Sequence, residues 1–149
     1  MPRFSRSSLF PDVNVWIALT YGGHEHHLAA RHWFQAVEMD ARVYFCRFTQ
    51  ISLLRLLTTA AVMGTDEVMT QVEAWNAYDQ WKQDARVFFL EEPPNVEVAF
   101  RGLTRQLRPN PKIWSDAYLA AFASAAGMQL VTFDQALHGK VENVLVLKP

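Results

Sequence analysis

Short apolar runs alternate with longer amphipathic segments along the whole chain. The apolar runs lack the polar alternation of half-exposed strands, and this is typical of strands buried on both faces. We expect strands at 8–12, 42–46, 86–90, 128–133 and 143–147. The segments between them predict helices at 14–21, 25–38, 50–63, 67–83, 95–107 and 116–126. Thr49 and Ser115 each precede a predicted helix and are expected to cap it.

Strands that alternate with helices predict an α/β fold, here a three-layer α/β/α domain around a parallel sheet. Right-handed crossovers bring the carboxyl ends of all strands to one edge, where such folds bind their ligands. The length of 149 residues suits one domain, so residues 1–149 are expected to form a single unit.

Composition narrows the class of protein. Half of the residues are apolar, which predicts a packed globule, and the net charge of −1 means that any nucleic-acid site must be local. The single cysteine, Cys46, excludes an internal disulfide and a thiolate zinc cluster. No apolar run approaches the ~18 residues of a membrane span, and "MPRFSRSSLF" does not resemble a signal peptide. We therefore expect a cytoplasmic protein without a membrane segment.

Three aspartates are predicted to lie at the carboxyl edge of the sheet. Asp12 follows the first strand, Asp134 follows the fourth, and Asp116 begins a helix after a loop. Taken singly, Asp12 is a possible helix cap and Asp134 a possible turn residue. If the carboxylates converge to ~4 Å, each like-charge pair costs about 4 kcal/mol at an effective dielectric of 20, so a cation or a shared proton is required. Oxygen ligands alone favour Mg²⁺ or Mn²⁺.

Three blocks, "DVNVWIAL", "FTQISLLRLLT" and "WSDAYLAAFASAAGMQLVTFDQAL", resemble the PIN-domain ribonucleases, and among these the VapC-type toxins of bacterial toxin–antitoxin pairs. The resemblance extends from about Leu9 to Val146. It implies the strand order 3-2-1-4-5 and Mg²⁺- or Mn²⁺-dependent endonucleolytic cleavage of RNA. It also implies that the catalytic and metal-binding acids are Asp12, Asp116 and Asp134.

One position departs from the pattern of this family. The second acid of the common Thr-x-x-Glu-Leu motif is replaced by Ser52, so one metal position is expected more firmly than two. Gln50, Glu91 and Glu92 remain alternative oxygen donors. The residues expected to support the acids are Asn14, Thr49, Gln50, Ser52, Arg55 and Thr132. Arg55 has three open interpretations: a side chain reaching solvent, a partner of a site acid, or a contact to another protein.

A stretch without acids, residues 98–115, precedes Asp116 and carries four cations. Three of them have the spacing of one helical face, and we expect all four to bind the RNA backbone, although a solvated face is the alternative. These are Arg101, Arg105, Arg108 and Lys112. The five tryptophans are expected in the core or in interfaces, and the histidines of "HEHHLAARH" at the surface rather than on a metal.

The resemblance also implies partners. These are an antitoxin that inserts a peptide across the acidic site, and a second copy of the chain that contacts the predicted helices at 25–38 and 49–62. The alternative function is a catalytically weak or inactive PIN-like module that binds RNA or protein. A phosphoaspartyl phosphatase is disfavoured, because Asn14 stands where such enzymes need a second aspartate.

Overall fold

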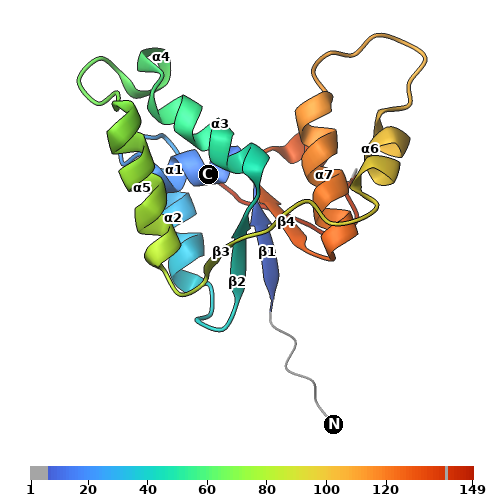
Figure 1. Cartoon of the computed structure of the whole chain (residues 1–149), viewed down its shortest axis with the longest axis horizontal. Helices are drawn as coiled ribbons and strands as arrows, with labels where there is room; N and C mark the ends of the chain where they lie inside the picture. Colours follow the sequence, from blue (N-terminus) through green and yellow to red (C-terminus); the bar gives the residue numbers. More distant parts are fainter. Residues whose placement is uncertain (1–6, 140) are drawn as a thin grey trace.

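The computed structural model describes residues 7–139 and 141–149. Its centre is a parallel, five-stranded sheet with the order β3-β2-β1-β4-β5 (Figure 1). The strands are β1 (Ser8–Pro11), β2 (Arg42–Phe45), β3 (Val87–Phe89), β4 (Gln129–Thr132) and β5 (Val144–Val146). The predicted sheet and its strand order are confirmed. Residues 1–6, in which no signal peptide is expected, lie outside the described residues.

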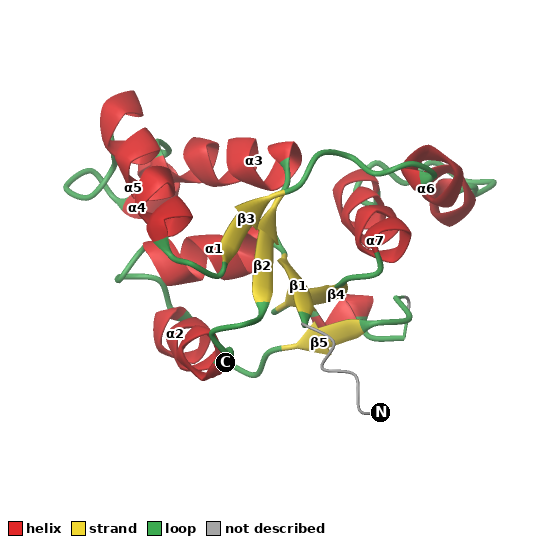
Figure 2. Cartoon of the chain, turned by 60° about the horizontal axis from the view of Figure 1, so that its bottom comes forward, coloured by secondary structure: helices red, strands yellow, loops and turns green. Residues whose placement is uncertain are grey.

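Helices cover both faces of the sheet, with α1 to α5 on one side and α6 and α7 on the other (Figures 1 and 2). The helices are α1 (Val13–Thr20), α2 (His27–Ala36), α3 (Arg47–Leu57), α4 (Ala60–Met63), α5 (Gln71–Gln83), α6 (Val96–Thr104) and α7 (Trp114–Ala126), with a 3₁₀ turn, η1, at Gln135–Leu137. Within the described ranges, no helix is both long and apolar enough to cross a membrane.

Each face of the sheet has its own hydrophobic core. Neighbouring residues of a strand point to opposite faces. On β1, Leu9 therefore joins the cluster around Trp16, whereas Phe10 joins the cluster around Phe122. Trp16 stacks on Phe45 at 3.8 Å between ring centroids, and Phe10 stacks on Phe122 at 4.9 Å. Burial on both faces explains why the strands read as uninterrupted apolar runs.

The helix predicted at 50–63 is divided in two. The Thr58 hydroxyl donates to the carbonyl oxygen of Leu54 at 3.0 Å, and the Thr59 hydroxyl donates to that of Arg55 at 2.5 Å. Such side-chain bonds compete with the backbone bonds that would continue a helix. The chain therefore turns after α3 and resumes as the short helix α4.

Candidate active site at the carboxyl edge of the sheet

Asp12 lies at the end of β1, where the chain enters α1. Its backbone N–H donates to the carbonyl oxygen of Val131 on β4 at 2.8 Å, and the residue is only 5% exposed. Its side chain makes no capping hydrogen bond to α1. Instead, Oδ2 accepts from the Thr132 hydroxyl at 3.0 Å and from the Asn14 amide at 3.4 Å. The carboxylate is thus fixed to the neighbouring strand rather than used as a helix cap.

Thr132 joins Asp12 to Asp134. The buried Thr132 hydroxyl donates to Asp12 and accepts from the Asp134 backbone N–H at 3.0 Å and from the Asn14 amide at 3.1 Å. A hydroxyl has one hydrogen to donate and two lone pairs, so all of its capacity is used. The Asn14 carbonyl oxygen accepts from the Phe133 N–H at 3.2 Å, which closes the network.

Asp116 lies in the first turn of α7, and it lines a cavity of about 180 Å³ together with Asp12. Ser52 and Arg55 of α3 line the same cavity. The helix begins at Trp114, one residue before the predicted cap, so Ser115 lies within the helix and is not its cap. In the first turn, the positive end of the helix dipole favours an ionised Asp116.

Burial raises the pKa of the Asp12 carboxyl above its ordinary value, and the negative charge of Asp116 raises it further. The hydrogen bond from Thr132 acts in the opposite direction and does not cancel the effect. Ionisation of Asp12 therefore costs more in this cavity than it does in water. A cation in the cavity would reverse this, since it would favour the ionised form of both acids.

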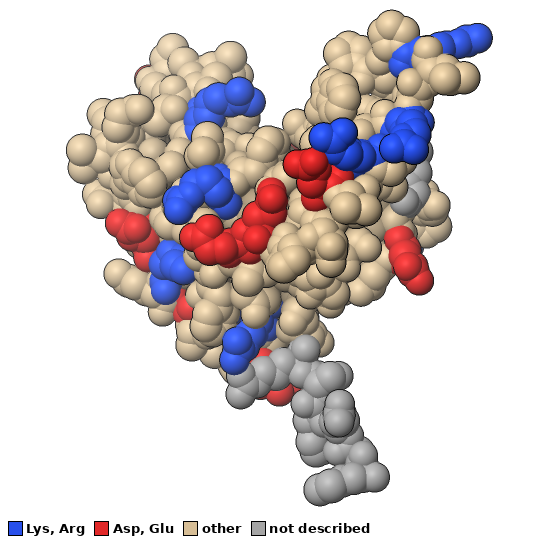
Figure 3. Space-filling model, turned by 45° about the vertical axis from the view of Figure 1, so that its right-hand side comes forward, with Lys and Arg blue, Asp and Glu red and all other residues tan. Residues whose placement is uncertain are grey.

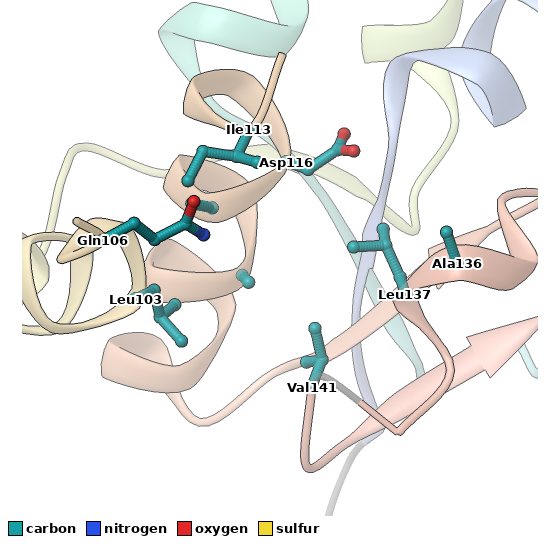
Figure 4. Close-up of a pocket in the computed structure, with 9 residues that line it drawn as sticks. Leu103, Gln106, Ile113, Asp116, Ala136, Leu137 and Val141 are labelled. Atoms are coloured by element: carbon teal, nitrogen blue, oxygen red, sulfur yellow. The ribbon is translucent and has the colours of Figure 1, made fainter. Parts of the chain in front are cut away.

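Asp134 is placed differently from the other two acids. Its Oδ1 accepts from the Ala136 N–H at 2.9 Å and so caps the turn η1. Asp116 also lines a second cavity, where it points from α7 toward the segment that carries Ala136 and Leu137 (Figure 4). Among the residues that the structure describes, no three His, Cys, Asp or Glu side chains are grouped closely enough to hold a metal. The structure therefore brings Asp12 and Asp116 to one cavity. Asp134 is connected to Asp12 through Thr132, which donates to the Asp12 carboxylate and accepts from the Asp134 backbone N–H.

The residues considered in place of the missing second acid separate into two groups. Ser52 lines the cavity, but Gln50 is buried elsewhere, and its side-chain oxygen accepts from Arg47 at 2.6 Å. Glu92 accepts from the Tyr118 hydroxyl at 2.6 Å, and neither it nor the exposed Glu91 lines this cavity. The hypothesis that one of these three side chains supplies a site oxygen finds no support in these positions.

Thr49 does not occupy the capping position predicted for it. The helix α3 begins at Arg47, and the Thr49 hydroxyl accepts from the Cys46 N–H at 3.0 Å from inside the first turn. Thr49 is fully buried and fixes the start of α3. Its support of the site is therefore indirect, through the placement of Ser52 and Arg55 on the same helix.

The predicted basic stripe is only partly helical. Because α6 ends at Thr104, Arg105 and Arg108 do not share a helical face with Arg101, as the spacing had suggested. Arg101 forms an exposed ion pair with Glu97 at 2.9 Å. The part of the molecule that carries α6 and the start of α7 forms an arm on one side of the sheet. Figure 3 shows basic side chains along this arm, with acidic side chains beside them. Arg108 and Lys112 are exposed on this arm.

Sequence reasoning missed Trp114, which it assigned with the other tryptophans to a core or interface. Trp114 is 54% exposed at the start of α7. Its position two residues before Asp116 and next to a basic segment was the available signal.

Comparisons with known proteins agree with the fold. A family model described as PIN domain matches residues 9–142. The chain is 42% identical to Ribonuclease VapC41 of Mycobacterium tuberculosis, over 94% of this chain and 99% of that protein. It is 34% identical to Ribonuclease VapC29 of the same organism, over 93% and 94% of the two chains.

Solved structures share the architecture at low sequence identity. Mycobacterium tuberculosis VapC20, described as a Sarcin-Ricin loop cleaving toxin, superposes with a TM-score of 0.67 at 17% identity, covering 94% of this chain and 99% of that one. VapBC2 from Rickettsia felis, bound to a DNA fragment from its promoter, gives a TM-score of 0.67 at 10% identity, with coverage of 95% and 99%.

Proposed function

The chain belongs to the PIN-domain family and is a VapC-type ribonuclease, and from this we propose that Asp12 and Asp116 are the carboxylates that hold its catalytic cation. The observation that carries the proposal is the shared cavity, which is lined by a buried carboxylate, a second carboxylate and the Arg55 side chain. We propose RNA as the substrate, hydrolysed at internal phosphodiester bonds.

The donor set of the cavity suits a hard divalent cation. The PIN-domain ribonucleases are generally dependent on a divalent metal, and we propose Mg²⁺ as the ion here, with Mn²⁺ as a substitute. Carboxylate oxygens from Asp12 and Asp116 and the Ser52 hydroxyl are ligands of the kind that these ions prefer. When bound, the ion supplies Lewis acidity toward the phosphate and makes water a better nucleophile at neutral pH.

The protein side chains orient the reacting groups. Thr132 and Asn14 hold Oδ2 of Asp12 at the wall of the cavity that Asp116 also lines. Asp134 follows Thr132 directly, and we propose that its second oxygen accepts a proton from the attacking water once RNA is bound. Arg55 offers a positive charge to the phosphate as negative charge accumulates on its oxygens.

We propose two protein partners, an antitoxin and a second copy of this chain. The relatives of known structure include VapBC assemblies, and an antitoxin segment that carries a cation would suit the Asp12–Asp116 cavity. Large apolar side chains are exposed on the helices expected to form the dimer, among them Leu28 on α2 and Ile51 on α3. We place the protein in the cytoplasm, where its RNA substrate is found.

The test compares cleavage of a single-stranded oligoribonucleotide by the wild type, Asp116→Asn and Asp66→Asn, with Mg²⁺ and with chelator. Asp66 is an exposed loop residue away from the cavity, so its variant controls for the loss of one charge. We expect Asp66→Asn to cleave like the wild type and Asp116→Asn to lose activity. Equal cleavage by all three proteins, or cleavage unaffected by chelator, would contradict the metal-site proposal. Binding of RNA without cleavage by the wild type would identify an inactive RNA-binding module instead.

A further inference from the structure

We propose that Trp114, Phe100 and Arg105 form a stacking site for an unpaired base of the RNA, next to the bond that is cleaved. The inference rests on the proposed ribonuclease function and adds a feature of its substrate. It predicts that the RNA is single-stranded at this point, because a base that is paired in a duplex has no free face to offer.

The site is a hollow of about 460 Å³ between α6 and the start of α7. Trp114 forms one wall and is 54% exposed, so about half of its surface is open to solvent. Phe100 supports the indole edge-on, with ring centroids 6.0 Å apart, and itself contacts Tyr118 in the same way at 5.6 Å. Trp114 is therefore held in place by ring packing against Phe100, and a rigid indole of this kind can stack on a flat ligand.

The charges around the hollow favour a nucleic acid over a protein as the occupant. Of the charged side chains that line it, Glu97 and Arg101 neutralise each other in an ion pair at 2.9 Å. Within the described residues Arg105 forms no ion pair, so its guanidinium group is available to bind a phosphate of the RNA. The chain that leaves Arg105 toward α7 adds Arg108 and Lys112 and contains no acid. Aromatic faces beside such cations are typical of surfaces that bind single strands.

The position on α7 sets which base is bound. Trp114 and Asp116 are two residues apart in the first turn, so about 200° of rotation places them on opposite sides of the helix end. An RNA strand with its reactive phosphate at Asp116 must pass over the amino end of α7 to reach Trp114. This end has no side-chain cap, so its backbone N–H groups can face a phosphate on the way. The base stacked on Trp114 therefore belongs to a nucleotide that flanks the cleaved bond.

The test measures binding without metal, so that cleavage plays no part. A fluorescein-labelled single-stranded hexaribonucleotide is titrated in chelator with the wild type, Trp114→Ala, Trp114→Phe and Trp75→Ala. Trp75 on α5 is 47% exposed and lines a different groove, so it is the matched control. We expect Trp114→Ala to weaken binding by roughly tenfold, Trp114→Phe to retain most of it, and Trp75→Ala to have no effect.

A hexamer with abasic sugars should bind the wild type as weakly as the normal hexamer binds Trp114→Ala, because the lost contact is to a base. Equal affinities for all four proteins, or equal affinities of wild type for normal and abasic RNA, overturn the stacking site. Thermal unfolding of each variant identifies any loss that comes from misfolding, and the comparison of normal with abasic RNA on the wild type decides the matter if Trp114→Ala is unstable. If the tryptophan effect is present but Mg²⁺ gives no cleavage, the proposed function fails and the base site stands. If cleavage occurs without the effect, only the base site fails.

Discussion

Replacing Asp116 by asparagine should stabilise the protein in the absence of metal, while it abolishes cleavage. Asp12 and Asp116 line the same cavity, and each carboxylate raises the cost of ionising the other. Asparagine is nearly the same size as aspartate and carries no charge, so the substitution removes the repulsion without leaving a cavity. A residue that is kept at the expense of stability is the signature of a binding site.

The size of the effect follows from the burial of the two groups. Asp12 is almost fully buried, whereas Asp116 is half-buried and screened by solvent. If the two carboxylate charges lie about 6 Å apart, they repel by ~0.7 kcal/mol in water and ~3 kcal/mol at an effective dielectric of 20. The intermediate value of about 1–2 kcal/mol, reduced by the ~0.3–1 kcal/mol that ionised Asp116 gains from the helix dipole, leaves a gain of about 1 kcal/mol. For a chain of this length, that raises the melting temperature by a few degrees.

The pH dependence has a definite sign. Because burial raises the pKa of Asp12 in the folded protein above its ordinary value of 3.8, the folded state holds this proton more tightly than the unfolded state does. The stabilisation by protonated Asp12 is complete below that value and is lost as the pH rises through the folded-state pKa. The advantage of Asp116→Asn over the wild type should therefore be small near pH 3.5 and largest at neutral pH.

Differential scanning calorimetry in chelator and low salt measures the difference, with Asp66→Asn as the charge-matched control. Addition of Mg²⁺ should raise the melting temperature of the wild type and close the gap, since the ion binds only the folded site. The reasoning is refuted if Asp116→Asn melts below the wild type in chelator, or if Asp66→Asn gains as much stability.

Three further substitutions test other parts of the cavity. Ser52→Glu restores a carboxylate and should lower the Mg²⁺ concentration needed for half-maximal cleavage by about tenfold, measured by metal titration. Thr132→Val leaves Asp12 without its hydroxyl donor and should cost about 1–3 kcal/mol in urea unfolding, whereas Thr132→Ser should cost much less. Arg55→Ala should reduce kcat by roughly a hundredfold with an unchanged melting temperature, and Arg55→Lys should recover only part of the rate. An unchanged kcat in Arg55→Ala would show that Arg55 takes no part in catalysis.

The positions of the strands were predictable because burial on both faces leaves a direct mark on the sequence. Residues such as Leu9 and Phe10 are apolar in succession since each supplies a different core. The same pattern placed Asp12 and Asp134 after strands, and the resemblance to the PIN-domain ribonucleases implied that these two strands are neighbours. What could not be foreseen is where each carboxylate points. Asp134 uses one oxygen to cap a turn, and the donor is a backbone N–H that any residue except proline would supply at position 136.

Helix ends were less predictable, because threonine hydroxyls decide them locally. "TTAAVM" is compatible with a continued helix, yet the hydroxyls of Thr58 and Thr59 bond back to the preceding turn and end α3. In the same way, the Thr104 hydroxyl donates to the carbonyl oxygen of Phe100 at 2.7 Å where α6 ends, which removes Arg105 from the predicted helical stripe. Helical spacing alone does not distinguish these cases from an uninterrupted helix.

The replacement of the usual second acid by Ser52 changes the charge balance of the cavity. Asp12 and Asp116 supply two negative charges, and Arg55 supplies one positive charge. One divalent cation then leaves a single net positive charge, which matches the single negative charge of a phosphodiester. A second divalent cation would leave three positive charges against that phosphate, with no further carboxylate on the cavity wall to hold it. We therefore expect calorimetry to find one ion bound per chain in the absence of RNA, and Ser52→Glu to be the change that admits a second.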